Sequence, residues 1–497
     1  MINWVIFIIA SIGLISVGAF SNHSIKKAKQ SGEGFLLGAK QIGAFVGAGT
    51  LMATGYSGWG FIGSPGTAYA YGTIEVLANF FFAPAITLGT LMFAGFMRKQ
   101  ADKFGGLTVP EYMAVTHRGT NKMKRIVHFV AGVATFVFLS VYIIGQIRAV
   151  GLVASEWLGI SQGLASMILV LVVIIFTMQG GLLAVAITDT IMCIGMLIAS
   201  VIVYFTITQD IPMMDLITQV GKLKSEFINP TSSVPYGNGI YSVFLVFIYA
   251  LLFTTTLPYM SVRFLSFKEN IKIHTMALIM APMGIILSLI PLTGIYMYYK
   301  DPNLTNPDSA MPVFLNTFLP PALGGMITLF ILFAMLSTIS SVLQALASSL
   351  SYDMYVSVAN KNSKHGDLIN RIGVLATALW ALFLTFVAPQ GLLNQIAYIG
   401  TGGLISAFVG PTIMRVLVEA NLRTCLSSMI TGFIANVILV FVFEVGWVEA
   451  PIIAGLAGSI VYIVMGYITN GMARKPKGQV ENSGSGYIEN LQQNKNS

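Results

Sequence analysis

The chain has 497 residues, of which 55% are hydrophobic and only 9% are charged. Soluble domains carry about 25% charged residues, so this composition excludes an ordinary soluble protein and indicates a polytopic membrane protein. The formal net charge is +8, which we ascribe to membrane topology rather than to nucleic-acid binding. The two cysteines, Cys193 and Cys425, have no paired spacing. They therefore give no support for a disulfide framework or a thiolate metal site.

Uncharged runs of roughly 20 residues are long enough to cross the hydrocarbon layer of a bilayer as helices. On this criterion the sequence predicts an all-α protein with thirteen membrane spans. Their approximate limits are 3–22, 44–70, 73–97, 127–154, 161–179, 182–207, 238–262, 274–298, 321–352, 370–388, 391–415, 424–443 and 450–470. The run 3–22 has its lysines after the apolar stretch, which is typical of an uncleaved span rather than a signal peptide.

The second run, 44–70, contains the stretch "LMATGYSGWGFIGSPGTAYAYG" from residue 51 to residue 72. Each glycine weakens a helix and proline removes a backbone donor, so we expect this span to be broken. Half-helix ends at membrane depth can hold ions and polar groups of a solute. A glycine-rich packing face is the alternative interpretation.

Ionisable residues inside the spans are the next candidates, because burial in a membrane makes them costly. Asp189 follows "MQGGLLAVAITD", in which Gly180 and Gly181 indicate a tight turn between two spans. The acid could serve an ion site, or it could pair with a neighbouring hydroxyl or with Arg148. Arg148 could also reach outward to water or bind a solute carboxylate. Glu75, at the start of its span, is predicted to be interfacial.

The run 238–262 has a second interruption, within "LLFTTTLPYMSVRF". Its polar and helix-breaking residues are Thr254, Thr255, Thr256 and Pro258, and Arg263 follows near the inner edge. The two interrupted spans are five apart in the chain. Interrupted helices in corresponding positions of two halves point to a transporter built from inverted repeats, with its site near the bilayer midplane.

The run 321–352 carries a stripe of polar residues on one helical face. The stripe is formed by Ser337, Ser340, Ser341, Gln344 and Ser348, with Thr338 beside it. Small hydroxyl residues often pack membrane helices together, so a packing role is one interpretation. Oxygen ligands suit hard cations, so a site for an alkali cation is the other.

Lysine and arginine gather on alternate connections between the predicted spans. Every second connection, starting with the one that follows 3–22 and ending with the C-terminal tail, belongs to one set, and this set holds 23 of the lysine and arginine residues. The other set of connections holds only Lys222, Lys224 and Lys300. Cytoplasmic connections are enriched in basic residues, so the N-terminus is predicted to lie outside and the C-terminus inside the cell. The expected location is the plasma or inner membrane.

Four motifs, "GGLLAVAITD", "SGWGFIGSPG", "LPYMSVRF" and "AMLSTISS", together resemble the sodium/solute symporter family. Its members include proline, pantothenate, sialic acid, sugar and monocarboxylate carriers. The resemblance covers roughly 35–420 and implies a leucine-transporter-like core of two inverted five-helix repeats that works by alternating access. With the predicted spans, it divides the chain into an extra span and loop (1–40), a first repeat (41–208), an outer connection (209–237), a second repeat (238–420) and two peripheral helices (421–470). The remaining tail (471–497) is polar and low in apolar residues, so we expect it to be disordered.

The resemblance implies sodium as the coupling ion and assigns ligands by motif. A first sodium site would use backbone oxygens of Ala53, Tyr56 and Ala334 with the hydroxyls of Ser337 and Thr338. Some members have a second sodium site, whose residues correspond here to Asp189, Ser337, Ser340 and Ser341. On this interpretation the hydroxyls replace the water around the ion.

The solute is less clearly indicated by the resemblance. Proline-type members have an acid where this chain has Gly55, and their aromatic positions correspond here to Ala250 and Thr254. Met192 stands where the family usually has glutamine. With no carboxylate in the break, we expect a solute with a carboxylate of its own, such as an organic acid or a pantothenate-like molecule. Candidate lining residues are Ser57, Trp59, Tyr142, Gln146, Thr254 and Thr255.

The sequence contains no paired carboxylates, no His/Cys cluster and no nucleophile elbow, so we do not expect an enzyme or a cofactor beyond Na⁺. The expected partners are a small solute, sodium and the lipid bilayer, and the sequence leaves the oligomeric state open. Three other functions stay open: a sodium-coupled amino acid symporter of the proline type, a proton-coupled carrier and a membrane solute sensor.

Overall fold

The computed structural model describes residues 2–27, 33–229, 234–237, 241–359, 366–389 and 391–472, and every regular element in these ranges is a helix. The α-helices are α1 (Ile2–Lys27), α2 (Glu33–Leu37), α3 (Ala44–Gly55), α4 (Ser64–Tyr71), α5 (Ile74–Phe104), α6 (Val109–Thr116), α7 (Asn121–Leu158), α8 (Gln162–Asp210), α9 (Met213–Leu223), α10 (Leu245–Thr256), α11 (Pro258–Ser266), α12 (Ile273–Leu287), α13 (Leu292–Lys300), α14 (Ala310–Phe318), α15 (Pro321–Ser348), α16 (Tyr355–Ala359), α17 (Gly366–Val387), α18 (Leu393–Ile413), α19 (Leu422–Phe441) and α20 (Glu449–Met472). Two π-helical segments are η2 (Trp59–Gly63) and η6 (Ser349–Met354). The 3₁₀ segments are η1 (Gly38–Lys40), η3 (Ser225–Ile228), η4 (Ser242–Phe244), η5 (Pro307–Ser309) and η7 (Met414–Val416). The tail predicted to be disordered, 471–497, lies outside the described residues except for its first two, which end α20.

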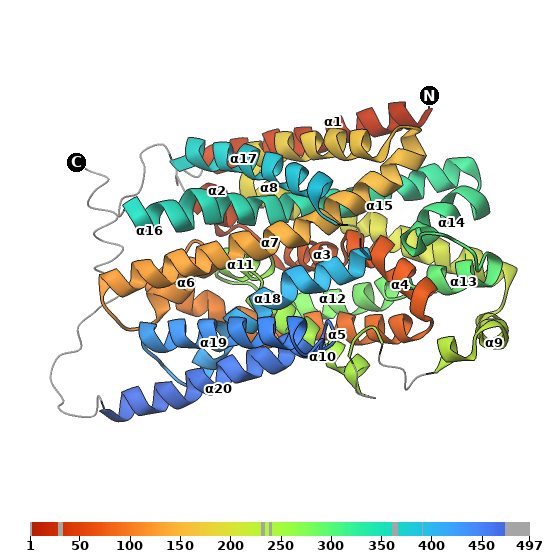
Figure 1. Cartoon of the computed structure of the whole chain (residues 1–497). Coiled ribbons are helices and arrows are strands. Elements are labelled where there is room, and N and C mark those ends of the chain that lie inside the picture. The colour runs from red at the N-terminus through yellow and green to blue at the C-terminus, as the bar shows by residue number, and fades with distance from the viewer. Residues whose placement is uncertain are drawn as a thin grey trace.

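The long helices run side by side in one bundle (Figure 1). One end of the bundle carries α6 and exposed basic residues such as Arg118 and Lys122, and we call it the basic end. The opposite end carries α9, α13 and α14. These two ends are the reference for the positions described below.

Ten helices in the described part of the chain are long and apolar enough to cross a membrane, and a bent pair, Ser242–Thr256 with Pro258–Ser266, makes eleven. The difference from thirteen predicted spans has two causes. α8 covers two predicted spans in a single run of 49 residues. The predicted span 44–70 is divided among α3, η2 and α4, none of which is long enough by itself. The protein is therefore a multi-pass membrane protein, as predicted.

The predicted turn between the spans 161–179 and 182–207 is confirmed inside α8. Gly181 has φ 52° and ψ −152°, a backbone conformation that favours glycine. A Cβ atom at this position would lie 2.5 Å from the carbonyl oxygen of Phe35. A straight helix of this length would be about 73 Å long, far more than a bilayer needs, so the chain must reverse here.

Both predicted helix interruptions are present. α3 ends at Gly55, and helical dihedral angles resume at Gly58 (φ −57°, ψ −33°). α10 and α11 meet at Leu257 with a bend of 57°, and Pro258 opens α11. Proline has no N–H to donate to the preceding turn, so it is suited to the first position of the second segment.

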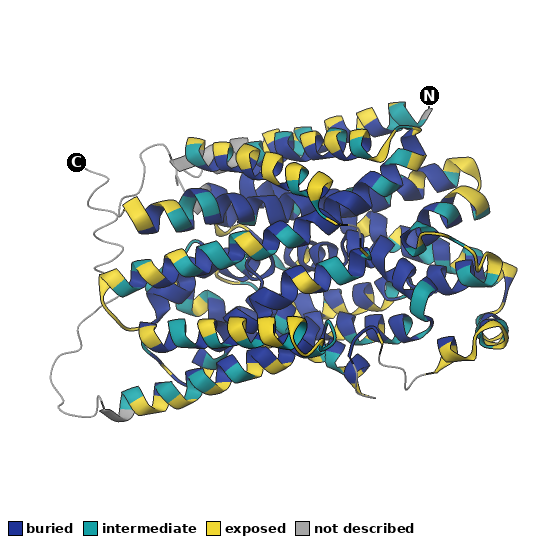
Figure 2. Ribbon diagram, in the orientation of Figure 1, coloured by how far each residue is buried: buried dark blue, intermediate teal, exposed yellow. Residues whose placement is uncertain are grey.

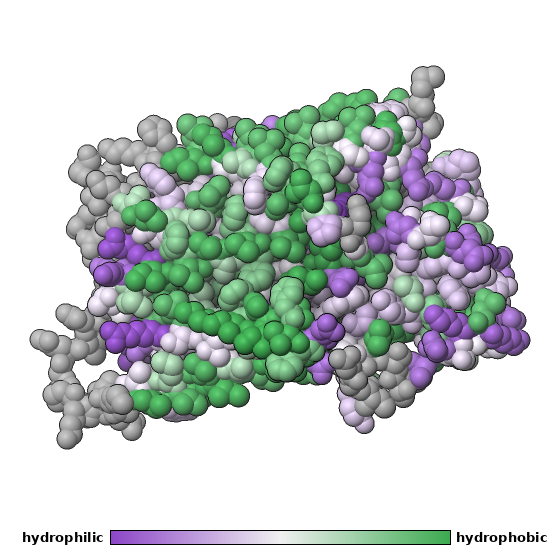
Figure 3. Space-filling model, in the orientation of Figure 1, coloured by the Kyte–Doolittle hydropathy of each residue, from purple (hydrophilic) through white to green (hydrophobic). Residues whose placement is uncertain are grey.

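The helices in the middle of the bundle are mostly buried, and exposed residues lie on the outer helices (Figure 2). Exposed apolar residues include Ile9, Leu278 and Phe441, whose exposed fractions are 65%, 74% and 74%. Figure 3 shows an apolar band over the middle of one face and polar residues toward both ends. This pattern is typical of a protein whose sides contact lipid and whose ends contact water.

Candidate functional site

The break between α3 and η2 interrupts the backbone hydrogen bonds of the helix. The N–H of Tyr56 still donates to the carbonyl of Met52 at 2.9 Å, and the next such bond, from Phe61 N–H to Ser57 O, is at 3.0 Å. The last carbonyls of α3 therefore lose their usual intrahelical donors. All residues from Leu51 to Gly63 are buried, so these carbonyls face protein or a cavity and not lipid.

The break lies between α7 and α15. The backbone N–H of Gly58 donates to the side-chain oxygen of Gln146 in α7 at 3.1 Å. A Cβ at Gly58 would be 2.9 Å from the same Gln146 oxygen and 3.1 Å from Met335 Cγ in α15, so these side chains would have to shift to admit it. The broken helix thus packs directly against the helix that carries the serine stripe.

The residues of the first predicted sodium site lie on these two packed segments. Ala53 and Tyr56 are buried at the break, and Ala334, Ser337 and Thr338 are buried on α15. Ser337 donates its hydroxyl hydrogen to the carbonyl of Ala334 at 3.0 Å. The hydroxyl of Thr338 is buried without a hydrogen-bond partner among the described residues. An unpaired buried hydroxyl is costly, which singles out this position.

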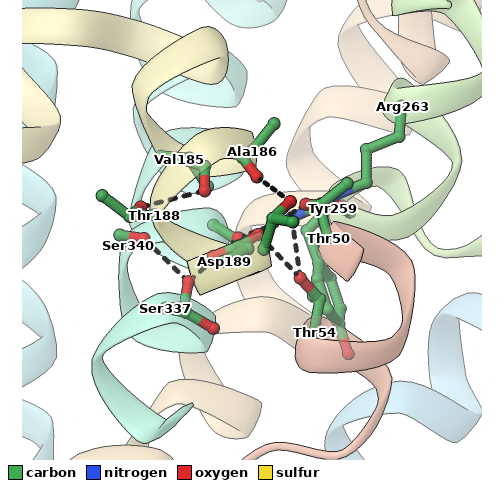
Figure 4. Close-up of polar contacts among 12 residues, drawn as sticks. Thr50, Thr54, Val185, Ala186, Thr188, Asp189, Tyr259, Arg263, Ser337 and Ser340 are labelled. Atoms are coloured by element: carbon green, nitrogen blue, oxygen red, sulfur yellow. Dashed lines mark hydrogen bonds and ion pairs between the residues drawn. The ribbon is translucent and has the colours of Figure 1, made fainter. Parts of the chain in front are cut away.

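Asp189 forms a buried ion pair with Arg263 in α11, at 2.9 Å, and both side chains are fully buried. The same carboxylate oxygen accepts from Thr50 at 2.5 Å and from Thr54 at 3.2 Å (Figure 4). Its other oxygen has no partner among the described residues. The sequence suggested a neighbouring hydroxyl or Arg148 as the partner of Asp189. Hydroxyl partners are present, but the cation that pairs with Asp189 is Arg263 and not Arg148.

The guanidinium of Arg263 also occupies oxygens that the second predicted sodium site would need. Its Nη2 group donates to Ser341 at 2.8 Å and to the hydroxyl of Thr54. Its Nε group donates to the hydroxyl of Thr50, and its Nη1 group donates to the carbonyl of Tyr259. Ser340 and Ser341 donate to the carbonyl of Ser337, at 2.7 and 3.0 Å. The guanidinium therefore supplies positive charge to the place where a second ion would sit.

Two charged residues lie differently from the sequence interpretation. Arg148 donates to the carbonyls of Thr385, Ala388 and Pro389 and so caps the C-terminal end of α17. It does not pair with Asp189, and it lines a polar pocket near the end of the bundle opposite the basic end. Glu75 was predicted to be interfacial, which is wrong: it is 1% exposed. The reason is that α4 turns back beside α5, so that Ser64 and Asn79 donate to the Glu75 carboxylate.

A small cavity of about 10 Å³ lies beside the break. Its lining consists of Trp59, Phe82, Tyr142, Tyr249, Phe253, Asn394, Ala397, Tyr398 and Thr401. Trp59 and Tyr142 were predicted from the sequence, and the remaining lining residues were not. The lining is mostly aromatic and contains no charged side chain.

The other predicted lining residues lie around this cavity. Ser57 hydrogen-bonds the hydroxyl of Tyr142 at 3.2 Å, and the side-chain oxygen of Gln146 accepts from the backbone N–H of Gly58 at the break. Thr254 and Thr255 are not part of the lining; each donates to a carbonyl of its own helix, such as Ala250 O at 2.8 Å for Thr254. Two aromatic residues of the same helix, Tyr249 and Phe253, line the cavity instead. In an apolar helix the sequence gives no signal for which face meets the cavity.

The cavity is closed toward the end opposite the basic end by polar contacts of α18. Asn394 donates to Thr67 of α4 at 3.1 Å, and the N–H of Leu393 donates to the Asp308 carboxylate at 3.2 Å. Burial raises the pKa of Asp308 to about 7, partly offset by the Leu393 N–H. Beyond this closure, Asp308 and Arg148 line a wider polar pocket of about 350 Å³.

Comparisons with known proteins give a consistent result. A model of the sodium:solute symporter family matches residues 35–432. The sodium/proline symporter of Staphylococcus aureus strain NCTC 8325 is 25% identical, over 96% of this chain and 95% of that protein. Sodium/proline symporter 2 of Staphylococcus saprophyticus is also 25% identical, over 88% of this chain and 86% of that protein.

Solved structures show the same fold at lower sequence identity. A Na⁺-coupled sialic acid symporter in a substrate-bound outward-open state has a TM-score of 0.74 and 19% identity, covering 95% of this chain and 98% of that one. A nucleobase-cation-symport-1 family transporter in a closed conformation has a TM-score of 0.56 and 12% identity, covering 92% and 98%. The predicted leucine-transporter-like fold is confirmed.

Proposed function

Because the chain belongs to the sodium:solute symporter family, we propose that it carries one small organic solute together with sodium by alternating access. The observation that carries this proposal is the broken helix packed against the serine stripe, with the Thr338 hydroxyl left unpaired. The proposed moving parts are the two repeats, 41–208 and 238–420, joined by the connection 209–237. The segments 1–40 and 421–470 flank them.

Sodium would bind first at the break. Carbonyl oxygens of Ala53, Tyr56 and Ala334 and the hydroxyls of Ser337 and Thr338 are hard oxygen donors, which suit an alkali cation. The ion would hold the broken helix against α15. If sodium and solute both prefer the conformation with this contact, each raises the affinity for the other.

The lining of the cavity favours a small solute with a carboxylate and an apolar body, and the cavity, which at about 10 Å³ has room for no more than one water in this conformation, would have to widen to admit it. The outer half of the broken helix, formed by η2 and α4, has its N-terminal end at the break, and the N-terminal end of a helix favours negative charge. Aromatic rings such as Trp59 and Phe82, with centroids 4.8 Å apart, would surround the apolar part. No charged side chain lines the cavity, so charges on the solute must be met by helix ends and sodium.

A proline-type solute is the second candidate. Tyr249 and Phe253 place aromatic rings from α10 beside the cavity, although Ala250 and Thr254 stand at the positions that the family motif assigns. Aromatic faces attract a positively charged amine. The named relatives are sodium/proline symporters at 25% identity, which adds a reason to include amino and imino acids among the solutes tested.

We propose the second sodium site only for a conformation that differs from the one described above. Asp189, Ser337, Ser340 and Ser341 could bind sodium only after the guanidinium of Arg263 withdraws, because both cations need the same oxygens. A conformation in which α11 moves relative to α8 would be required. We propose the first site as the main coupling site.

The proposed orientation puts the basic end in the cytoplasm, with the N-terminus outside and the C-terminus inside a cell membrane. The exposed basic residues at that end, such as Arg118 and Lys122, support it. The polar pocket beside Asp308 would then face the exterior.

The test uses the purified protein in liposomes. Counterflow of radiolabelled proline, pantothenate and short monocarboxylates is measured with an inward gradient of sodium or of choline, with and without a proton gradient. We expect sodium-dependent uptake of one solute class. Uptake driven equally well by protons in choline would favour a proton-coupled carrier, and binding without counterflow would favour a sensor.

The matched variant is Thr338→Val, which removes a hydroxyl with no partner in the part of the chain that the structure describes and keeps the side-chain shape. We expect the sodium concentration for half-maximal uptake to rise about tenfold, which corresponds to about 1.4 kcal/mol. Thr177→Val removes another buried hydroxyl, on α8, that has no partner among the described residues, and it is the control. Equal sodium dependence in both variants would contradict the first site.

A further inference from the structure

A separate cavity of about 30 Å³ lies between the serine stripe and the basic end. It is large enough for one or two occupants of the size of water. Ser341 and Gln344 of α15 line it on one side, and Thr108, at the start of α6, lines it on the other. The cavity thus overlaps the stripe, of which Ser341, Gln344 and Ser348 line it. Figure 1 shows α15 and α16 continuing toward the end of the bundle that carries α6.

Two oxygen atoms in the lining of this cavity are buried and have no hydrogen-bond partner among the described residues. They are the side-chain oxygen of Gln344 and the hydroxyl of Ser349, whose side chains are 4% and 1% exposed. The amide nitrogen of Gln344 donates to the carbonyl of Phe35 at 3.0 Å, and this bond fixes the oxygen as the unpaired end. Unpaired buried acceptors in a native fold need an explanation such as an ion or a water.

A carboxylate completes the lining at the same place. Asp353 is 1% exposed and lines the cavity together with Ser348 and Ser349. One of its oxygens accepts from Thr108 and from His128, the latter at 2.8 Å. These bonds hold the carboxylate in position from α6 and α7.

The local helix geometry explains why these residues share one cavity. Residues 349–354 form a π-helical segment, η6, at the end of α15. A π-turn contains more residues than an α-turn, so it shifts the faces of the residues that follow it. Ser349 and Asp353 are four apart within this segment and both line the cavity. Such segments are frequent at functional sites.

We propose that Gln344, Ser349 and Asp353 form a further alkali-cation site, a station through which sodium passes from the stripe toward the basic end. Amide, hydroxyl and carboxylate oxygens are hard donors that suit sodium. The inference rests on the proposed sodium-coupled function and adds a site to it. None of these three residues belongs to the two sodium sites that the family motifs assign.

The experiment measures sodium binding by the purified full-length protein without solute. Thermal stabilisation is followed against sodium concentration, with choline chloride keeping the ionic strength constant. Thr338→Val is the background variant, because it weakens the first site. We expect a sodium response to remain in this background. Adding Ser349→Ala should raise its apparent Kd at least fivefold.

The control is Ser21→Ala in the same background. Ser21, on α1, is also a fully buried serine whose hydroxyl has no partner among the described residues. Both substitutions remove one unbonded hydroxyl, so neither should impair folding, and only Ser349→Ala should change the sodium response. Asp353→Asn should raise the same Kd.

The possible outcomes separate this proposal from the proposed function. If Ser349→Ala and Ser21→Ala give the same Kd, the cavity holds only water and the station is overturned while sodium coupling stands. If the unmodified protein is stabilised equally by sodium and choline, both proposals fail. A selective effect of Ser349→Ala supports the station.

Discussion

At the scale of single residues, the most tightly constrained group is the guanidinium of Arg263. It joins Asp189 of α8, Thr54 of α3 and Ser341 of α15, so one side chain connects four helices. A buried ion pair adds little stability by itself, but removing one partner leaves the other charge uncompensated. Replacing one partner of the Arg263–Asp189 pair should therefore lower the free energy of unfolding measurably.

We expect Arg263→Gln to lower the free energy of unfolding by about 3–5 kcal/mol, because it leaves the Asp189 carboxylate buried and unpaired. The double variant Arg263→Gln with Asp189→Asn should recover part of this loss. Thermal unfolding in sodium-free choline buffer measures both. A double variant no more stable than the single one would show that the pair is not coupled in this way.

The Asp308 carboxyl gives a prediction about pH. Its pKa is raised to about 7 by burial, above the value near 4 of an unfolded chain. The native state therefore holds the proton more tightly, and this contribution to stability is complete below about pH 4 and lost as the pH rises to about 7. Between pH 5.5 and pH 8 the loss should be about 2 kcal/mol.

The measurement is the unfolding temperature at pH 5.5 and pH 8 in the unmodified protein and in Asp308→Asn. Asparagine keeps an acceptor for the Leu393 N–H but does not ionise. The variant should therefore lose part of the pH dependence. If both proteins show the same slope, Asp308 does not titrate in this range.

At the scale of elements, the outer half of the broken helix depends on close helix contacts. A Cβ at Gly294 in α13 would lie 2.0 Å from the carbonyl oxygen of Pro65 and 2.7 Å from the backbone nitrogen of Tyr69. α13 and α4 therefore touch backbone to backbone. This contact holds α4 beside the cavity.

We expect Gly294→Ala to destabilise the protein by about 1–3 kcal/mol, because the added methyl group forces α13 away from α4. Gly13→Ala is the control, since a Cβ at Gly13 on α1 meets no atom within 4 Å. Alanine also favours a helix over glycine, so the control should be neutral or stabilising. Equal unfolding temperatures for the two variants would contradict the close contact.

Sequence patterns predicted the elements well where the backbone itself was unusual. The glycines and proline of the second run and Pro258 indicated both interruptions, and Gly180 and Gly181 indicated the reversal in α8. Contacts between distant segments left no such signal. Arg263 is 74 residues from Asp189, and Glu75 is buried only because α4 folds beside it. The aromatic cavity residues could not be distinguished within apolar helices, where either face is hydrophobic.

At the scale of the whole molecule, the proposed topology can be tested by labelling single cysteines in intact cells. The native cysteines, Cys193 and Cys425, are both fully buried, so background labelling should be low. We expect a membrane-impermeant maleimide to label Asn303→Cys, at the end opposite the basic end, and not Lys122→Cys, at the basic end. Both positions are exposed. The reverse pattern would invert the orientation.

The reversal in α8 has a consequence for how the chain enters the membrane during synthesis. Gly181 joins two spans with no polar loop between them, so the translocon must release them as one hairpin. The second arm carries Asp189, which is made 74 residues before Arg263. In the nascent protein, Asp189 therefore enters the membrane when only two of its hydrogen-bond partners, Thr50 and Thr54, have been synthesised. Arg263, which neutralises its charge, is synthesised later.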